Sequence, residues 1–416
     1  MFRRLFFLLV SISAVLPTVS AIVPTDYPWI DCQGSARPYP VPAVPAEYPD
    51  SLTPVMINHV GRHGARFPAT PSHVTVLGRA LDNAQRLGTV TPLGIRLKSL
   101  VEQVERLSAG RWGALDSLGA AEQRGIAARM YAGFPEVFEA GRVMAQSSYV
   151  PRCVMSMYEF LHEITCRDRK IDITAVSGPQ ASPLMRFFED NKDYRDVVKR
   201  GAVPDEIEKF TAANVTMEPL RRVLGRDYPF GTDSAAVAMA EYSVLAGLSA
   251  MGLDEDVAVF LTPSEQNRLW SIFNLRQYLT RTATTLSAVP ADIAAPLLEN
   301  LITTTDAFIR GDRSVAPVML RFGHAETLMP LLSLMRLPGC FYLTNRFETV
   351  ARGWTDFTVV PMAANLQLIL FRSETGRYYL RVDLNEKPVA LRSGYGDLYT
   401  PWNVARVYLS ERLPLY

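Results

Sequence analysis

The 416-residue sequence contains little lysine and no excess of either charge. Only six of its 43 basic residues are lysines, 37 are arginines, and 42 acidic residues bring the net charge to +1. A nucleic-acid-binding protein usually carries a basic excess, so this balance argues against that class. A composition of 48% hydrophobic and 20% charged residues is typical of a soluble globular protein. It excludes a disordered chain, a fibrous repeat and a protein that spans the membrane several times.

Long apolar runs are absent after the N-terminus. At the start, arginines precede an uncharged apolar run at residues 5–16, and small residues follow at 19–21. This pattern predicts a secretory signal over residues 1–21, with the mature chain starting near Ile22. The alternative is an uncleaved anchor. We therefore expect a protein of the secretory pathway that is secreted or resides in the ER lumen or an acidic organelle, without stable membrane insertion after cleavage.

Cysteine is also scarce. The four cysteines are Cys32, Cys153, Cys166 and Cys340. An even number in an oxidising compartment predicts two disulfides, with three possible pairings, and the spacings match no zinc motif. One sequon, Asn214-Val215-Thr216, predicts glycosylation at Asn214.

Strand and helix patterns divide the chain into four parts. Residues 22–54 are rich in proline and predict an extended segment. Strands are predicted at 55–60 and 315–322 and in a hairpin at 366–372 and 378–384, and helices at 72–87, 92–108 and 117–131. Residues 155–300 show mostly helical periodicity. The sequence therefore predicts an α/β domain formed by both ends of the chain, 55–154 and 301–416, with an inserted helical cap at 155–300.

Two of the five histidines follow predicted strands. His63 lies in Arg62-His63-Gly64-Ala65-Arg66. The flanking guanidinium groups disfavour a protonated imidazole and suit the oxygens of a phosphate group, and a glycine lets a ligand approach the backbone. The segment therefore predicts phosphoryl transfer to His63. The alternative is a solvated arginine-rich loop with an incidental histidine.

The second histidine lies in Gly323-His324-Ala325-Glu326, after the later strand. His324 would donate to phosphoryl oxygens. Glu326 would be a general acid, provided that its pKa is raised enough to retain a proton. The alternative is an ordinary helix N-terminus, where the helix dipole favours glutamate.

Taken together, these segments resemble the histidine acid phosphatases, or branch-two histidine phosphatases, through RHGxRxP after an early strand and HAE after a late one. The HAE form, in place of HD, resembles the multiple inositol polyphosphate phosphatases within that family. Similar stretches run through nearly the whole mature chain: Leu118-Gly119, Glu122-Gln123 ahead of Arg129, Pro151-Arg152-Cys153 with Ser156 and Phe160, and residues 320–328, 363–366 and 385–389.

The resemblance implies a role for each matched residue. His63 would be the nucleophile that forms a phosphohistidine, and His324 would contact the transferring phosphoryl group. Glu326 would protonate the leaving oxygen and then activate water. Arg62, Arg66 and Arg152 would hold the phosphate, although the residues alone leave a structural role for Arg152 equally open. The fold would be a phosphoglycerate-mutase-like α/β domain with a helical cap, and the scheme needs no metal or cofactor.

Several positions depart from the family pattern. Ala65 replaces the common Thr or Ser and Phe67 a usual Tyr, which would alter the pocket wall without removing a catalytic group. Ser393 and Tyr399 lie where cysteines of a late family disulfide are expected.

Other polar residues have simpler interpretations. His59 is predicted to be a core or supporting histidine, His73 a surface residue, and His162 a structural residue near Cys166. Residues 167–170 are predicted to be a solvated face. Lys199 and Arg200 would either meet outlying phosphates of a substrate or end a solvated helix.

Three functions follow from these observations. The first is a phosphomonoesterase that acts on inositol polyphosphates such as phytate, with a small phosphorylated molecule as its partner. The second is a broad histidine acid phosphatase that acts on simple phosphomonoesters. The third is a catalytically silent binding protein, which the presence of all six site residues argues against.

Overall fold

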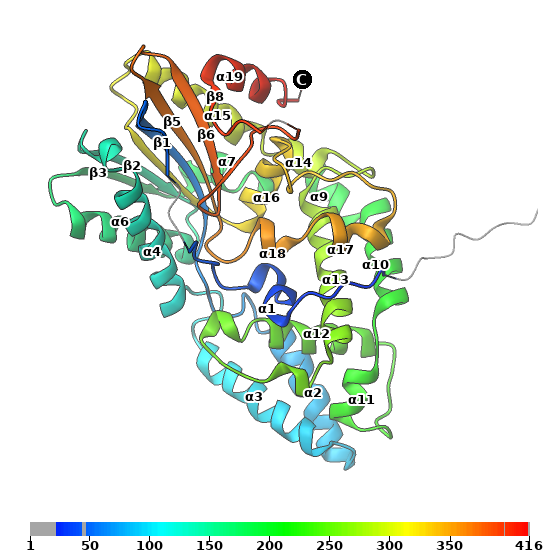
Figure 1. Ribbon diagram of the computed structural model, residues 1–416. Helices are drawn as coiled ribbons and strands as arrows, with labels where there is room; N and C mark the ends of the chain where they lie inside the picture. The colour runs from blue at the N-terminus through cyan, green and yellow to red at the C-terminus, as the bar shows by residue number, and fades with distance from the viewer. Residues whose placement is uncertain (1–21, 44–46, 395, 415–416) are drawn as a thin grey trace, which may run out of the picture.

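A computed structural model of the chain, which describes residues 22–43, 47–394 and 396–414, is built around one eight-stranded sheet (Figure 1). The strand order is β3-β2-β4-β1-β5-β6-β7, and β8 pairs with β6. The strands are β1 (Leu52–Arg62), β2 (Arg142–Ser147), β3 (Asp172–Ser177), β4 (Val318–Gly323), β5 (Asn365–Ser373), β6 (Tyr378–Leu384), β7 (Lys387–Val389) and β8 (Thr400–Pro401). The predicted α/β class is confirmed.

The sheet joins a parallel half to an antiparallel half at β1. Strands β3, β2, β4 and β1 run parallel, whereas β5 pairs antiparallel with both β1 and β6. In the register of β1 and β4, Arg62 lies opposite Gly323. The two strands therefore end at the same edge, and the residues that follow them, His63 and His324, are brought together.

The predicted strands agree best with the structure where they rest on long apolar patterns. The hairpin of β5 and β6 and the strand at 315–322 are confirmed, and β1 begins earlier than expected, at Leu52. Pro54 is accommodated within β1 because the register with β5 shifts between Pro54 and Met56. The sequence did not predict β2 and β3, which have six residues each.

Local capping sets the limits of the helices that follow β1. The predicted helices are confirmed as α2 (Ser72–Leu87), α3 (Pro92–Ser108) and α4 (Ser117–Gly133). The side chains of Thr91 and Asp116 accept hydrogen bonds from the first turns of α3 and α4, at 3.1 and 2.8 Å. Gly88 ends α2 in the left-handed conformation.

Helices cover both faces of the sheet (Figure 1). Helices α4 and α6 (Pro151–Arg167) pack on one face, where Phe160 of α6 meets Phe322 of β4. Helices α15 (Ala295–Ile309), α16 (Ala325–Leu334) and α19 (Trp402–Ser410) pack against the other face. The sheet is thus the middle of three layers, and its two faces bury separate apolar clusters.

A helical body extends from one end of the sheet. It contains α10 (Ala202–Asn214), α11 (Glu218–Leu224), α12 (Ser234–Ala246) and α13 (Pro263–Arg281). Helices α2 and α3, from the predicted α/β part, pack on α12 and α11, whereas β3, from the predicted cap, belongs to the sheet. The division at 55–154, 155–300 and 301–416 stays a prediction, and the packing crosses the boundary at residue 155 in both directions.

The shorter helices connect these layers. They are α1 (Trp29–Cys32), α5 (Pro135–Phe138), α7 (Ser182–Met185), α8 (Phe187–Asp190), α9 (Lys192–Lys199), α14 (Val289–Asp292), α17 (Val350–Gly353) and α18 (Asp356–Val359).

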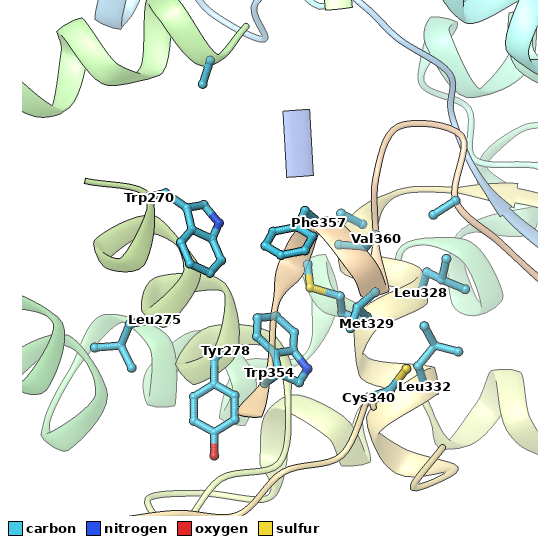
Figure 2. Packing of buried hydrophobic residues seen from close by; sticks show 14 of the residues in the cluster. Trp270, Leu275, Tyr278, Leu328, Met329, Leu332, Cys340, Trp354, Phe357 and Val360 are labelled. Carbon is cyan, nitrogen blue, oxygen red and sulfur yellow. The ribbon is translucent and has the colours of Figure 1, made fainter. Parts of the chain in front are cut away.

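An aromatic core holds α13 beside α16. Figure 2 shows Trp270 and Tyr278 of α13 facing Trp354 and Phe357, with Leu328 and its neighbours on α16 behind them. Trp270 also donates a 2.9 Å hydrogen bond to Asp356. Because protein interiors are packed as densely as organic crystals, this core fixes the position of α13 against the sheet domain.

The prediction of two disulfides is wrong for this structure. All four cysteines are free thiols, with Cys166 exposed and the other three buried. Cys153 and Cys166 lie at opposite ends of α6, and Cys32 and Cys340 lie in α1 and in the loop after α16. The sequence supplied an even number of cysteines, but the fold does not pair them.

The glycosylation predicted at Asn214 stays a prediction. Its side chain is buried, its Nδ2 donates a 2.8 Å hydrogen bond to the Phe210 carbonyl, and its Oδ1 accepts a 2.9 Å bond from the Ile22 N–H. The amide nitrogen that would carry a glycan is therefore buried and hydrogen-bonded in the folded chain.

The predicted signal at residues 1–21 lies outside the described residues. Among the residues that are described, no helix is long and apolar enough to cross a bilayer.

Candidate active site

The loop after β1 holds His63 through hydrogen bonds from both ends of the chain. The His63 N–H donates to the Gly323 carbonyl at 3.0 Å, and the His63 carbonyl accepts from the Ala363 N–H at 3.1 Å. From α4, Glu122 accepts from the Ala65 N–H at 2.7 Å, and Gln123 donates to the Arg62 carbonyl at 2.9 Å. The family-like pair Glu122-Gln123 therefore supports the loop rather than the substrate.

The imidazole of His63 is neutral and oriented. Its Nδ1 lies 2.9 Å from the Gly64 carbonyl oxygen, which only accepts, so Nδ1 carries the proton. The other nitrogen, Nε2, then holds a free electron pair. Burial lowers the pKa of His63 well below its ordinary value, and the charges of Arg62, Arg66 and Arg152 lower it further.

Three arginines, Arg62 buried and Arg66 and Arg152 half-buried, surround this imidazole without an acidic partner. Arg62 donates to the Ser35 and Val360 carbonyls at 2.6 and 2.7 Å, and Arg66 donates to the Phe67 carbonyl at 2.9 Å. The Nε atoms of Arg62, Arg66 and Arg152 are buried with no hydrogen-bond partner. Within the described ranges, none of the three forms an ion pair.

Burial and mutual repulsion lower the pKa values of two of these arginines. The pKa of Arg62 falls to about 10, and that of Arg66 to about 9. Both groups therefore remain positively charged at neutral and acidic pH. An anion at this place would supply the missing negative charge and the missing acceptors.

His324 faces His63 across the site. The two ring centroids are 5.8 Å apart, and the rings are nearly perpendicular. Its Nε2 lies 3.0 Å from the Ser148 hydroxyl, and Arg152 lies 3.3 Å from its Nδ1. Burial, with the charges of Arg152 and Arg186, lowers the pKa of His324 to about 3, so this ring is also neutral.

Glu326 lies in the first turn of α16, and its side chain reaches α13. Its Oε1 accepts a 2.7 Å hydrogen bond from Nη2 of Arg281, the last residue of α13. Burial alone would raise the pKa of Glu326, but the charge and hydrogen bond of Arg281 outweigh it and hold the pKa well below its usual range. The condition of a raised pKa is therefore not met in the free site, where Glu326 is an ionised carboxylate.

Sequence reasoning did not identify Arg186 and Arg281. Arg186 lies 3.3 Å from Nε2 of His324, beneath the ring of Tyr149, and pairs with Glu189. Both arginines come from the helical part of the chain and carry no local motif. Only the folding of that part over the sheet edge brings them to the site.

The remaining singled-out residues lie where the simpler interpretations put them. His59 is buried between Phe160 and Phe322, with ring centroids 5.4 and 5.3 Å away, so it is a core histidine. His162 and Cys166 are exposed near the end of α6. His73 is exposed at the start of α2 and lines a cavity of about 280 Å³ with Arg66.

The same holds for Lys199 and Arg200, which are exposed at the end of α9. Arg200 is 82% exposed and lies 3.7 Å from Asp196, as at a solvated helix end. Phe67, one of the departures from the family pattern, packs under the guanidinium of Arg111 at 4.3 Å.

Sequence comparisons find similarities to known proteins. A family model described as "Histidine phosphatase superfamily (branch 2)" matches residues 260–385. Human multiple inositol polyphosphate phosphatase 1 is 26% identical over 385 residues, which cover 84% of this chain and 78% of that protein.

Solved structures share the fold. A crystal structure of the Bifidobacterium longum multiple inositol polyphosphate phosphatase, in complex with inositol hexasulfate, matches with a TM-score of 0.81 and 18% identity over 92% of this chain and 99% of that one. The phytase from D. castellii matches with a TM-score of 0.66 and 15% identity, covering 93% of this chain and 86% of that chain.

Proposed function

We propose, on the premise that this chain is a branch-two histidine phosphatase, that it removes phosphate from inositol polyphosphates such as phytate through a phosphohistidine at His63. The named relatives support the substrate class, since they include multiple inositol polyphosphate phosphatases and a phytase. The geometry of this chain supports the chemistry.

One observation carries the proposal. A neutral histidine with a free Nε2 lies among three guanidinium groups whose Nε atoms are buried without a hydrogen-bond partner and that have no carboxylate partner in the described chain. An unpaired buried charge is strongly destabilising, so a cluster of them is typical of a site that is completed by an anionic ligand. A phosphate group supplies both the charge and the acceptors that arginine binds best.

The reaction follows from these positions. Nε2 of His63 attacks phosphorus, the P–N bond forms, and the P–O bond to the substrate breaks. Arg62, Arg66 and Arg152 stabilise the charge on the non-bridging oxygens, and His324 contacts the same group. Glu326 gives its proton to the leaving alkoxide. In the second half, Glu326 takes a proton from water, whose oxygen attacks phosphorus and breaks the P–N bond.

The carboxyl of Glu326 must gain a proton before it can act. In the free site Arg281 keeps it ionised. A bound phosphate adds negative charge beside Glu326 and favours its protonation, and acidic solution supplies the proton. The reaction is therefore expected to run best at acidic pH.

The secretory pathway is the compartment we propose for this enzyme. The arginines, apolar run and small residues at 1–21 support a cleaved signal. N-terminal sequencing of the protein from its own cells should find a start near Ile22, and a start at Met1 would contradict this proposal.

The decisive experiment measures phosphate release from phytate at acidic pH in the presence of a chelator. The parent should release phosphate, and His63→Ala should lose at least about a thousandfold in kcat, because the nucleophile is gone. His162→Ala changes an exposed histidine on α6 and is the matched control, expected to act like the parent.

The alternatives give different results. Turnover of an aryl phosphate without release from phytate would indicate the broad acid phosphatase. Equal activity of parent and His63→Ala would contradict the phosphohistidine route. It would indicate that the chain is a binding protein and that the activity comes from another phosphatase in the preparation.

A further inference from the structure

The contact between Glu326 and Arg281 joins the expected leaving-group acid to the helical body. Arg281 is 20% exposed and Glu326 33%, and their side chains meet at 2.7 Å. The core in Figure 2 holds α13 against α16, so both residues are positioned by rigid helices. Nothing in the RHGxRxP or HAE motifs requires a partner for this carboxylate.

The rest of the Arg281 guanidinium links two parts of the site. Its Nη1 donates to Gln277 and to the Thr280 hydroxyl, and Gln277 in turn donates to the Ser35 hydroxyl at 3.0 Å. The Ser35 carbonyl accepts the 2.6 Å hydrogen bond from Arg62. Arg281 is therefore connected through two residues to an arginine that is expected to hold the reacting phosphate.

One nitrogen of Arg281 remains available. Its Nε is buried and has no partner. Arg281 also lines a cavity of about 760 Å³ with Arg276, Thr280 and Tyr194. The lining also includes Glu208, so two guanidinium groups against one carboxylate leave this cavity with a net positive lining, which is suited to a second anionic group of the same substrate.

We propose that Arg281 is a positioning residue whose ion-pair partner changes from Glu326 to a second phosphate group of the substrate. Glu326 then becomes the leaving-group acid when this neighbouring phosphate is bound. This inference rests on the proposed function and extends it to how a polyphosphate is distinguished from a simple phosphomonoester. A substrate with one phosphate leaves the ion pair intact. A polyphosphate draws Arg281 into the cavity and frees the carboxylate.

The proton balance is simple. With Arg281 engaged by the second phosphate, Glu326 faces the negative charge of both phosphate groups and takes one proton from solvent. That proton passes to the leaving alkoxide as the P–O bond breaks and the P–N bond to His63 forms. Water later returns a proton to Glu326 as its oxygen attacks phosphorus, the P–N bond breaks and His63 is released.

Other groups around Glu326 are part of this balance. They are His324 beside it, Arg62 and Arg66 from β1 and its loop, Tyr194 from α9 and Cys153 from α6. Arg281, in contrast, is hydrogen-bonded to Glu326, and a variant can remove its charge without changing the arginines around His63.

The test compares the pH dependence of kcat on phytate and on an aryl phosphate, since kcat reports the ionisations of the enzyme–substrate complex. In the parent, the alkaline decline should occur at lower pH with the aryl phosphate than with phytate. In Arg281→Gln, the alkaline decline of kcat on the aryl phosphate should move to higher pH by about one pH unit or more. The difference in pH dependence between the two substrates should then vanish. The preference for phytate in kcat/KM should fall about tenfold, the loss of one charged hydrogen bond.

Two variants serve as controls. Arg281→Lys keeps the charge and should retain a separation between the two profiles. Arg268→Gln removes the same charge from an exposed position on α13 and should match the parent. Thermal unfolding of each variant checks that α13 remains folded.

The outcomes separate the two proposals. This inference would be overturned if the parent showed the same pH dependence of kcat on phytate and on the aryl phosphate. It would also be overturned if Arg281→Gln kept the parent's difference between the two substrates. Equal losses in Arg281→Gln and Arg281→Lys without a shift in pH, which indicate a structural role, would overturn it as well. A parent that hydrolyses the aryl phosphate but not phytate would contradict the proposed substrate, while an upward shift of the aryl profile in Arg281→Gln would still support the ion pair.

Discussion

Buried arginines differ in this molecule by what satisfies their charge. Arg381 is fully buried and forms two hydrogen bonds with Asp383, at 2.8 and 2.7 Å. Arg321 is buried as well and donates to the amide oxygens of Asn58 and Asn300. These two contribute to structure. The three arginines around His63 have no such acceptors for their Nε atoms, which is why we place them at the phosphate.

A buried carboxyl away from the site sets a pH dependence of stability. Glu241 of α12 is fully buried, neither of its oxygens has a hydrogen-bond partner, and burial raises its pKa to about 8. The folded chain therefore keeps a proton that the unfolded chain releases above its ordinary pKa of about 4.5. The resulting stability is fully present below that value and is lost as the pH rises toward about 8.

Replacing this carboxyl should remove the loss. Glu241→Gln should match the parent near pH 4.5 and unfold at least roughly 3 °C higher at pH 8, because a neutral amide needs no proton. Thermal unfolding between pH 4.5 and 8 measures this difference, with the exposed Glu105→Gln as control. Parallel curves for parent and Glu241→Gln would contradict the buried, protonated state.

At the level of elements, α4 fixes the position of the loop that carries His63. Its first turn lies directly against Gly64 and Ala65, and a Cβ at Gly119 would fall inside contact distance of the Ala65 carbonyl and amide nitrogen. Glu122 and Gln123, one turn later, bind the same loop through its backbone. The position of His63 therefore depends on the absence of a side chain at residue 119.

A single methyl group at this contact should be costly. Gly119→Ala should push the loop away from α4 and lower kcat by about a hundredfold or more, since a displacement near 1 Å at a reacting group has that effect. Kinetics and thermal unfolding should be compared with Gly133→Ala, at the other end of α4, where an added Cβ meets nothing within 4 Å. Gly133→Ala should be neutral or slightly stabilising; equal activity of the two variants would contradict this role of α4.

For the whole molecule, long-range pairing replaces covalent cross-links. Strand β1 lies between β4 and β5, so segments separated by more than 250 residues form the centre of one sheet. The apolar clusters on both sides of this sheet are large, as the burial of Val60, Leu366 and Ile369 illustrates. Such a core stabilises a chain of this size without disulfides.

The state of the thiols tests this description. Denatured protein, alkylated without reductant, should take up four equivalents of iodoacetamide, because all four cysteines are free. Under native conditions only the exposed Cys166 should react readily. Mass spectrometry gives both counts, and two or fewer equivalents in denaturant would show that a disulfide forms.

The local patterns of the sequence were sufficient for the strand and loop that carry His63, the strand that leads to His324, the C-terminal hairpin and the helices α2 to α4. Each depends on neighbours in the chain: alternating or continuous apolar residues, a capping side chain, or a glycine after the last turn. The resemblance in the two motifs then predicted the fold and the phosphatase activity. The core location of His59 also followed from its place in a strand.

Tertiary structure alone decided the features that depend on distant neighbours. Strands β2 and β3 are short, so their formation depends more on the pairing of β2 with β4 and of β3 with β2 than on their own residues. The low pKa of Glu326 depends on Arg281, 45 residues earlier, and the burial of Asn214 depends on its contact with Ile22, 192 residues earlier. A sequence pattern records which groups exist, whereas their charge, partners and accessibility arise only when long-range packing brings them together.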